Sequence, residues 1–281
     1  MLPKPPYNHI PPNHARLHAR KGMTIVIGMI AEDGIVIAAD REEGTEHLKN
    51  DTGKIYGAFR GTEPHGWISI GGAGSGPECD EISALLANRF CSQEERTSDE
   101  MRAALTVEHR SYYQNIVLPF ASATQIGCPD YSLVVGCLTG QTGKYLFSTS
   151  KLAVNTANDY DAIGIGAQVA NIWLTRLYER MPTIAAAKLA AYVIYQVKNS
   201  VTGCGLGTDI VVMNGRPFLP RVPSNVIRKW EDSFRYFPIL ERTIFSYCVG
   251  LKPSPTQYKG RPLRSRVGWL PQPTERSALN G

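Results

Sequence analysis

This chain of 281 residues has no apolar run long enough to span a bilayer. Its most apolar stretch, residues 184–197, contains Lys188 and is typical of a packed helix. Residues 1–22 are rich in Pro, His, Lys and Arg and have no hydrophobic block of signal-peptide length. We therefore expect a soluble protein that is directed neither to secretion nor to a membrane.

Metal-binding and nucleic-acid-binding patterns are also missing. The six cysteines form no Cys-x-x-Cys pair, and the histidines show no ligand spacing, which argues against a zinc site. Unpaired cysteines favour free thiols in a reducing compartment. The net charge of +5 is mild and densest at the two ends of the chain, without interleaved aromatic residues. These absences predict a cytoplasmic protein with no metal, no other cofactor and no nucleic-acid partner.

The most informative segment that is present runs from Thr24 to Arg41. Apolar and β-branched residues fill 24–30 and 35–39, and Glu-Asp-Gly separates the two runs, a pattern that predicts a β-hairpin. Asp40 and Arg41 follow the second strand directly. The hairpin therefore brings an acid and a base close to Thr24.

Thr24 would gain a chemical role as the first residue of a processed chain. A threonine hydroxyl is a weak nucleophile and needs an adjacent base. A free α-amine, with a pKa of about 7.7 to 8.0, suits that work at neutral pH. An N-terminal Thr24 would carry both groups, whereas an internal Thr24 has no such amine.

The spacing of Thr24, Gly28, Asp33, Asp40 and Arg41 resembles the opening of proteasome β-subunits and of the HslV-type and other proteasome-like peptidases. Further segments extend this resemblance to about residue 215: Gly53-Lys54-Ile55-Tyr56, Trp67–Gly74, Ser132–Cys137, Lys144–Phe147 and Ala162–Ala167. The resemblance implies a threonine-type endopeptidase in a homo-oligomer. Its expected substrates are unfolded proteins or peptides, and an ATPase partner is a further family expectation.

The same resemblance suggests roles around Thr24. Lys54 would lower the pKa of the hydroxyl and the amine electrostatically, and Asp40 would hold the lysine charged and oriented. Gly72 best matches the glycine whose backbone N–H stabilises the oxyanion. The expected reaction is acyl transfer to Thr24, followed by hydrolysis.

Other positions depart from the family pattern. Ile165 stands where active β-subunits have a serine between two glycines, and it cannot hydrogen-bond the amine. The Asp-x-x-Ser-Gly motif is replaced by Asn199-Ser-Val-Thr202-Gly203, in which Asn199 is neutral and Thr202 keeps a hydroxyl. We expect Asn199 and Thr202 to support Thr24 in the catalytic site.

The residue before Thr24 is Met23, whereas precursors of the family usually cut themselves after a glycine at this place. Translation that starts at Met23, followed by removal of the methionine, would leave Thr24 first. Residues 1–23 are then a flexible leader or a misassigned start. The mass of the N-terminus distinguishes these possibilities.

The expected elements alternate between strands and helix pairs. After the hairpin and two strands come helices at 77–90 and 97–117, strands at 132–138 and 144–149, helices at 167–180 and 183–199, and a strand at 208–213. This order predicts an α+β protein with two sheets face to face and helix pairs outside. The resemblance names it as the four-layer αββα sandwich of N-terminal nucleophile hydrolases. The domain would span 24–215, followed by a Pro-rich extension, 216–281, with one helix near 224–237 on which Val226, Trp230 and Phe234 share a face.

Several alternatives stay open at the level of sequence. Asp40 and Lys54 could form a structural ion pair in a noncatalytic scaffold subunit. The fold would also suit an amidohydrolase for a small amide. The glycines of 71–76 could cradle a phosphate, although the preceding elements form a hairpin and not a βαβ unit.

Overall fold

The computed structural model describes residues 24–44, 49–59, 66–90, 96–124, 128–139, 143–214 and 221–249. The expected leader at 1–23 lies outside these residues, as do His47, His65, Cys91 and the chain beyond 249. The chain forms two compact units, Met1–Arg235 and Tyr236–Gly281. The larger unit contains both sheets described below.

The first sheet is antiparallel and has the strand order β10-β1-β2-β11. Its strands are β1 (Ile25–Ile30), β2 (Ile35–Asp40), β10 (Tyr160–Gly164) and β11 (Thr208–Met213). The predicted hairpin is confirmed: β1 pairs with β2, and the Ala31 N–H donates to the Gly34 carbonyl at 2.8 Å across the turn. The predicted last strand, 208–213, pairs with the other side of β2.

The second sheet is also antiparallel and runs in chain order from β5 to β9. Its strands are β5 (Ile55–Phe59), β6 (Gly66–Gly74), β7 (Tyr131–Thr139), β8 (Gly143–Ser150) and β9 (Ala153–Ala157). A short ribbon of β3 (Glu42–Gly44) and β4 (Lys49–Asp51) connects the two sheets along the chain.

Alternate residues of β1 and β2 face opposite sides of the first sheet, as strand geometry requires. Val26 and Ile37 join a buried cluster with Val134 and Leu146 of the second sheet. Gly28 permits the close approach of the sheets, because a Cβ there would lie 2.5 Å from Val134 Cγ1. The two sheets therefore pack directly against each other through apolar side chains.

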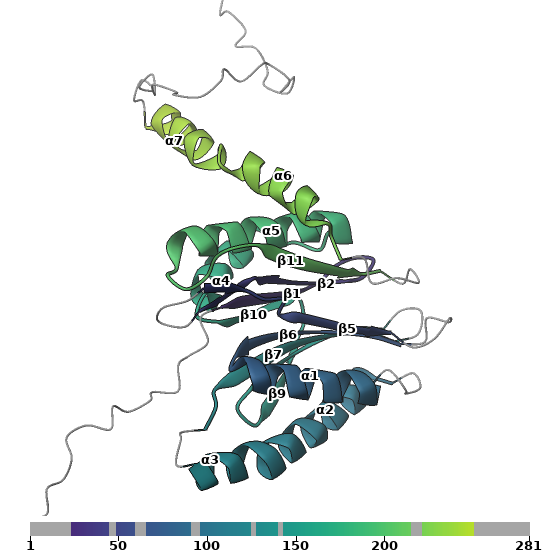
Figure 1. The fold of residues 1–281 in the computed structure, drawn as a ribbon. Coiled ribbons are helices and arrows are strands. Elements are labelled where there is room, and N and C mark those ends of the chain that lie inside the picture. The colour runs from purple at the N-terminus through teal and green to yellow at the C-terminus, as the bar shows by residue number, and fades with distance from the viewer. Residues whose placement is uncertain are drawn as a thin grey trace, which may run out of the picture. The chain divides into compact units, whose positions relative to one another are not determined.

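Helices cover the other face of each sheet (Figure 1). The apolar residues of α4 (Ala167–Leu177) and α5 (Thr183–Ser200) share a core with β1, β2 and β11. Those of α1 (Gly76–Phe90) and α2 (Ser98–Tyr112) share another with β6 and β7. The predicted capping box is confirmed, with Thr97 and Glu100 bonding reciprocally at the start of α2. The helix predicted to end near 117 continues through a π-helical turn (Tyr113–Val117) into α3 (Leu118–Thr124).

The C-terminal extension contains two helices instead of the one predicted: α6 (Ser224–Phe234) and α7 (Phe237–Cys248). Ile227 and Phe234 of α6 are buried in the core that α5 lines, whereas Val226 and Trp230 are half-buried. The division between the two compact units falls after Arg235. The domain boundary expected after residue 215 stays a prediction. Within the described ranges, no helix is both long and apolar enough to cross a membrane.

Candidate active site

Thr24 lies at the head of β1, where the hairpin register brings it beside the end of β2. Its hydroxyl donates a hydrogen bond of 2.6 Å to Asp40 Oδ1, and the Ile25 N–H donates to the same oxygen at 3.0 Å. Thr24 is 3% exposed and Asp40 is fully buried. The predicted proximity of these two residues follows from strand pairing alone.

Lys54 immediately precedes β5 and reaches this pair from the second sheet. Its Nζ donates to the Thr24 hydroxyl, to Asp40 Oδ1 at 2.9 Å and to the Glu42 carbonyl at 2.5 Å. The lysine side chain is only 11% exposed, so solvent screens its charge weakly. An ammonium in this position stabilises negative charge that develops on the threonine oxygen.

The Asp40 carboxylate accepts four hydrogen bonds. Three come from Thr24, Ile25 and Lys54 to Oδ1, and the fourth is donated by the Gly205 N–H to Oδ2 at 3.0 Å. A fully buried carboxylate is costly unless it is paired and hydrogen-bonded in this way. Gly205 belongs to the loop between α5 and β11, and sequence reasoning did not select it. Its backbone donor carries no residue-specific signal that could have been found.

A second ionic network fixes the ends of the strands that carry the cluster. Arg41 Nη1 lies 3.3 Å from Asp209 Oδ1, and Arg221 Nη1 lies 3.4 Å from Asp209 Oδ2. Arg221 also donates to the Ile55 carbonyl at 2.9 Å, one residue after Lys54. These contacts join the end of β2, the start of β11 and the start of β5, and thereby help to position Lys54 beside Asp40.

Gly72 does not have a free N–H for an oxyanion. Its N–H donates to the Lys54 carbonyl at 3.1 Å, which extends the pairing of β5 with β6. Alternate residues of a strand direct their N–H groups to the same edge. Gly74 is the last residue of β6, so its N–H is expected at the same edge of the strand as that of Gly72, two residues past the position that pairs with Lys54. Gly74 has a positive φ of 117° and directly precedes the start of α1. The N–H of Gly72, the predicted oxyanion donor, is thus already paired with the Lys54 carbonyl.

Asn199 and Thr202, the predicted support residues, do not join the cluster. Both are exposed, and neither side chain makes a hydrogen bond to any part of the chain that the structure describes. The loop that contains Thr202 instead contributes Gly205 and the buried Cys204. The structure therefore brings together Thr24, Asp40 and Lys54, and leaves Asn199 and Thr202 outside.

Two buried thiols lie near these charged groups. Burial raises the pKa of Cys204 to about 12, with Asp40 adding to the rise, and burial likewise raises the pKa of Cys79 to about 12. Both thiols are consequently protonated at neutral pH and are poor nucleophiles. No group of three His, Cys, Asp or Glu side chains that could hold a metal occurs among the described residues.

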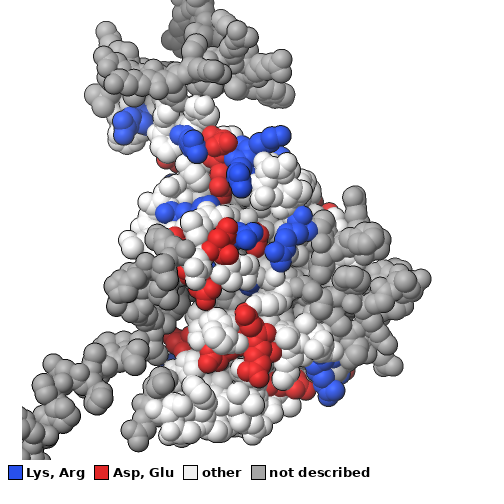
Figure 2. Space-filling model, in the orientation of Figure 1, with Lys and Arg blue, Asp and Glu red and all other residues white. Residues whose placement is uncertain are grey.

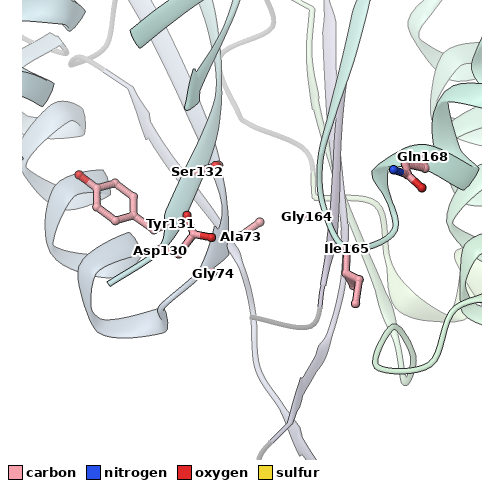
Figure 3. Close-up of a pocket in the computed structure, with 8 residues that line it drawn as sticks. All are labelled: Ala73, Gly74, Asp130, Tyr131, Ser132, Gly164, Ile165 and Gln168. Carbon is pink, nitrogen blue, oxygen red and sulfur yellow. The ribbon is translucent and has the colours of Figure 1, made fainter. Parts of the chain in front are cut away.

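A cavity of about 400 Å³ opens beside Thr24, between the end of β6 and the turn after β10 (Figure 3). Gly164 separates it from Thr24, since a Cβ on Gly164 would lie 2.3 Å from the Thr24 carbonyl oxygen. The Gly166 N–H donates to the same oxygen at 3.3 Å. The lining residues are Ala73, Gly74, Asp130, Tyr131, Ser132, Gly164, Ile165 and Gln168.

Two contacting antiparallel sheets with helices on their other faces, and a threonine, aspartate and lysine cluster at the head of the first strand, define an α+β protein with the proteasome-type fold. The chain belongs to the proteasome subunit family, whose sequence model matches residues 19–213.

Solved structures agree with this fold. Anbu (ancestral beta-subunit) from Yersinia bercovieri is similar with a TM-score of 0.65 and 17% identity, over 82% of this chain and 100% of that one. Anbu from Hyphomicrobium sp. strain MC1 gives 0.61 and 16%, over 79% and 97%. The helical assembly of the Anbu complex from Pseudomonas aeruginosa gives 0.60 and 17%, over 84% and 100%. A comparison with curated proteins found no match.

Proposed function

We propose that this chain is a threonine-type endopeptidase whose nucleophile is Thr24. The observation that carries the proposal is the hydroxyl of Thr24, which donates to buried Asp40 and accepts from Lys54. A hydroxyl held between a cation and an oriented carboxylate is prepared for attack once an adjacent base is present. Loss of the residues before Thr24 would supply that base as a free α-amine.

The reaction would proceed by acyl transfer. The amine takes the proton of the Thr24 hydroxyl while the oxygen attacks the substrate carbonyl, and Lys54 stabilises the negative charge on that oxygen. We propose the Gly74 N–H, in place of the Gly72 N–H, as the donor to the oxyanion, because the Lys54 carbonyl pairs with Gly72 and not with Gly74. The amine then protonates the leaving nitrogen, and water releases the acyl group from Thr24.

The fold and assembly are part of the same proposal. We assign the two contacting sheets and their helices to the four-layer αββα sandwich of N-terminal nucleophile hydrolases. The similar Anbu complex from Pseudomonas aeruginosa is a helical assembly, which supports a homo-oligomer here. Unfolded proteins or peptides are the proposed substrates, and an ATPase partner stays a prediction.

The test compares Thr24→Ala with Thr106→Ala, a half-buried threonine on α2, in chains whose mature N-terminus has been determined by mass. We expect Thr24→Ala to lower hydrolysis of an unfolded protein by about 10⁴-fold or more, since the nucleophile is lost. Thr106→Ala should retain the wild-type rate. Equal rates in wild type and Thr24→Ala would contradict the proposal.

The second candidate is a noncatalytic subunit of the same fold. The exposed positions of Asn199 and Thr202, away from the cluster, favour it, as does Ile165 in place of a hydroxyl residue. In that case Asp40 and Lys54 would be a structural ion pair. The absence of hydrolysis and of labelling at Thr24, in an assembled protein that begins with Thr24, would support this candidate.

A further inference from the structure

The cavity beside Thr24 is bordered by Gly164 of β10, whereas Lys54 reaches the Thr24 hydroxyl from the start of β5. The Thr24 carbonyl accepts from the Gly166 N–H and therefore faces the extension of β10. The N–H and C=O of one strand residue point to the same neighbour, so we expect the nitrogen of Thr24, which directly precedes β1, to face this side as well. The hydroxyl instead contacts Asp40 and Lys54. We therefore place the amine of Thr24 on the β10 side of the hydroxyl that Asp40 and Lys54 hold.

This geometry locates the leaving part of a substrate if Thr24 acts as proposed. In the acylation step the Thr24 Oγ1–carbon bond forms, the carbon–nitrogen bond breaks, and the hydroxyl proton passes through the amine to the leaving nitrogen. The leaving nitrogen must therefore lie near the amine. The wall of Gly164 and Ile165 on that side borders the cavity.

We propose that this cavity binds the substrate residue that directly follows the scissile bond, and that it favours lysine or arginine there. This inference rests on the proposed peptidase function and adds the substrate class. Gly164 and Gly74 both have positive φ and no side chain, so the space between their two turns stays open.

The chemistry of the walls selects a cation. Asp130 is the only charged residue among the eight described residues that line the cavity. Ile165 is 45% exposed on the opposite wall and can cover the aliphatic stem of a lysine or arginine. Figure 3 shows the Tyr131 ring turned away from Ile165, so its backbone, and not its phenol, borders the space.

Further acidic residues follow close by in the chain, although none of them is among the described lining residues. Helix α1 begins two residues after Gly74, and its first turns carry Glu78, Asp80 and Glu81. Figure 2 shows acidic side chains gathered over this part of the molecule. Because Asp130 is exposed, solvent screens its pairing, and we expect a preference of only about two- to fivefold.

The experiment uses the mature full-length protein and peptides that differ only in the residue after the cleaved bond: Lys, Gln or Glu. Wild type should show kcat/KM in the order Lys, Gln, Glu, with about two- to fivefold between Lys and Gln. Asp130→Asn should abolish the difference between Lys and Gln. Asp99→Asn, an exposed acid on α2, should leave the wild-type order intact.

The outcomes separate this inference from the proposed function. Equal cleavage of all three peptides, or a lysine preference that survives in Asp130→Asn, would overturn the inference and leave the peptidase intact. Cleavage of none of them, with no labelling of Thr24, would overturn both. If Asp130→Asn does not fold, the wild-type lysine preference should fall between 0.05 and 0.5 M salt, roughly the range over which screening becomes strong. A preference that ignores salt would then contradict the role of Asp130.

Discussion

The buried polar residues around Thr24 differ from those beneath α2 in how their polar atoms are satisfied. Around Thr24, the Asp40 carboxylate has four hydrogen-bond donors and Lys54 Nζ has three acceptors. In the core beneath α2, His109 is fully buried and packs edge-to-face on Tyr131 at 5.6 Å. Both ring nitrogens of His109 and the Tyr131 hydroxyl have no hydrogen-bond partner in the described part of the chain.

This difference distinguishes polar side chains that are oriented by hydrogen bonds from polar side chains that are only buried. Burial lowers the pKa of His109. Burial, with smaller contributions from Cys79, Tyr113 and Glu78, raises the pKa of Tyr131 far above its ordinary value, so both side chains stay neutral at pH 7. Neither side chain has a charged partner that would direct a proton. The Thr24 cluster instead combines a hydroxyl, a pair of opposite charges and an adjacent cavity. A perturbed pKa is therefore a poorer guide to function here than the partners of a group.

Among variants that keep Thr24, the largest effect should come from the loss of Lys54, which breaks the satisfied cluster. Lys54→Met removes the charge that stabilises the Thr24 oxygen, and we expect hydrolysis to fall by about 10²- to 10⁴-fold. The unpaired Asp40 should also lower the free energy of unfolding by about 3 to 5 kcal/mol. Peptide hydrolysis and urea unfolding measure the two losses. Lys144→Met, which removes a bond to the Glu32 carbonyl at the protein surface, is the control.

A wild-type rate in Lys54→Met would show that Lys54 has only a structural role. A loss of hydrolysis in Lys54→Met no greater than that in Lys144→Met would also show that Lys54 has only a structural role.

The next effect is a pH dependence of stability that arises from His109, whose ring nitrogens have no hydrogen-bond partner in the described part of the chain. Burial depresses the pKa of His109 below 6.5, so the stability from its neutral form is fully present above the unfolded pKa. This stability should be lost as the pH falls from about 6.5 through the folded pKa, by at most about 1.4 kcal/mol per pH unit. Urea unfolding between pH 7.5 and 4.5 should show that slope in wild type and a shallower one in His109→Leu. Identical slopes would rule out His109 as the cause.

The smallest expected effect is on the free energy of unfolding, when one hydroxyl is removed from each of the two clusters. Tyr131→Phe removes an unpartnered group and should change the free energy of unfolding by less than about 1 kcal/mol, in the stabilising direction. Thr24→Val removes a partnered hydroxyl and should destabilise by about 1 to 3 kcal/mol, because Asp40 and Lys54 each lose a bond. Thermal unfolding of the two variants measures the contrast. Equal changes would mean that the Thr24 bonds add nothing to stability.

The hairpin and the meeting of Thr24 with Asp40 could be predicted because a short turn fixes the register of its strands. The register Val26↔Ala39 leaves only one place for Asp40, beside Ile25. The position of Lys54 near Thr24 could be predicted because the segment Gly53-Lys54-Ile55-Tyr56 resembles the family pattern. The pairing of the Gly72 N–H with the Lys54 carbonyl could not be predicted, because the run from Gly71 to Gly76 offers several equivalent glycines and no local pattern distinguishes them.

Other features depend on contacts that no local pattern contains. The strands β9 and β10 were not predicted as separate elements, because few of their residues are buried and the alternation is weak. Helix α7 was missed because its apolar residues, such as Leu240 and Ile244, are more than half exposed. The cavity is lined by three separate segments, around Gly74, Asp130 and Gly164, so its position follows only from the tertiary fold.

The central claim, that Thr24 is the nucleophile, is tested most directly by the site at which a threonine-directed electrophile attaches. Peptide mass mapping of the labelled, assembled protein should find the adduct on a peptide that begins with Thr24, and no adduct in Thr24→Ala. An unlabelled N-terminal peptide that begins with Thr24, or an adduct on another residue, would contradict the account.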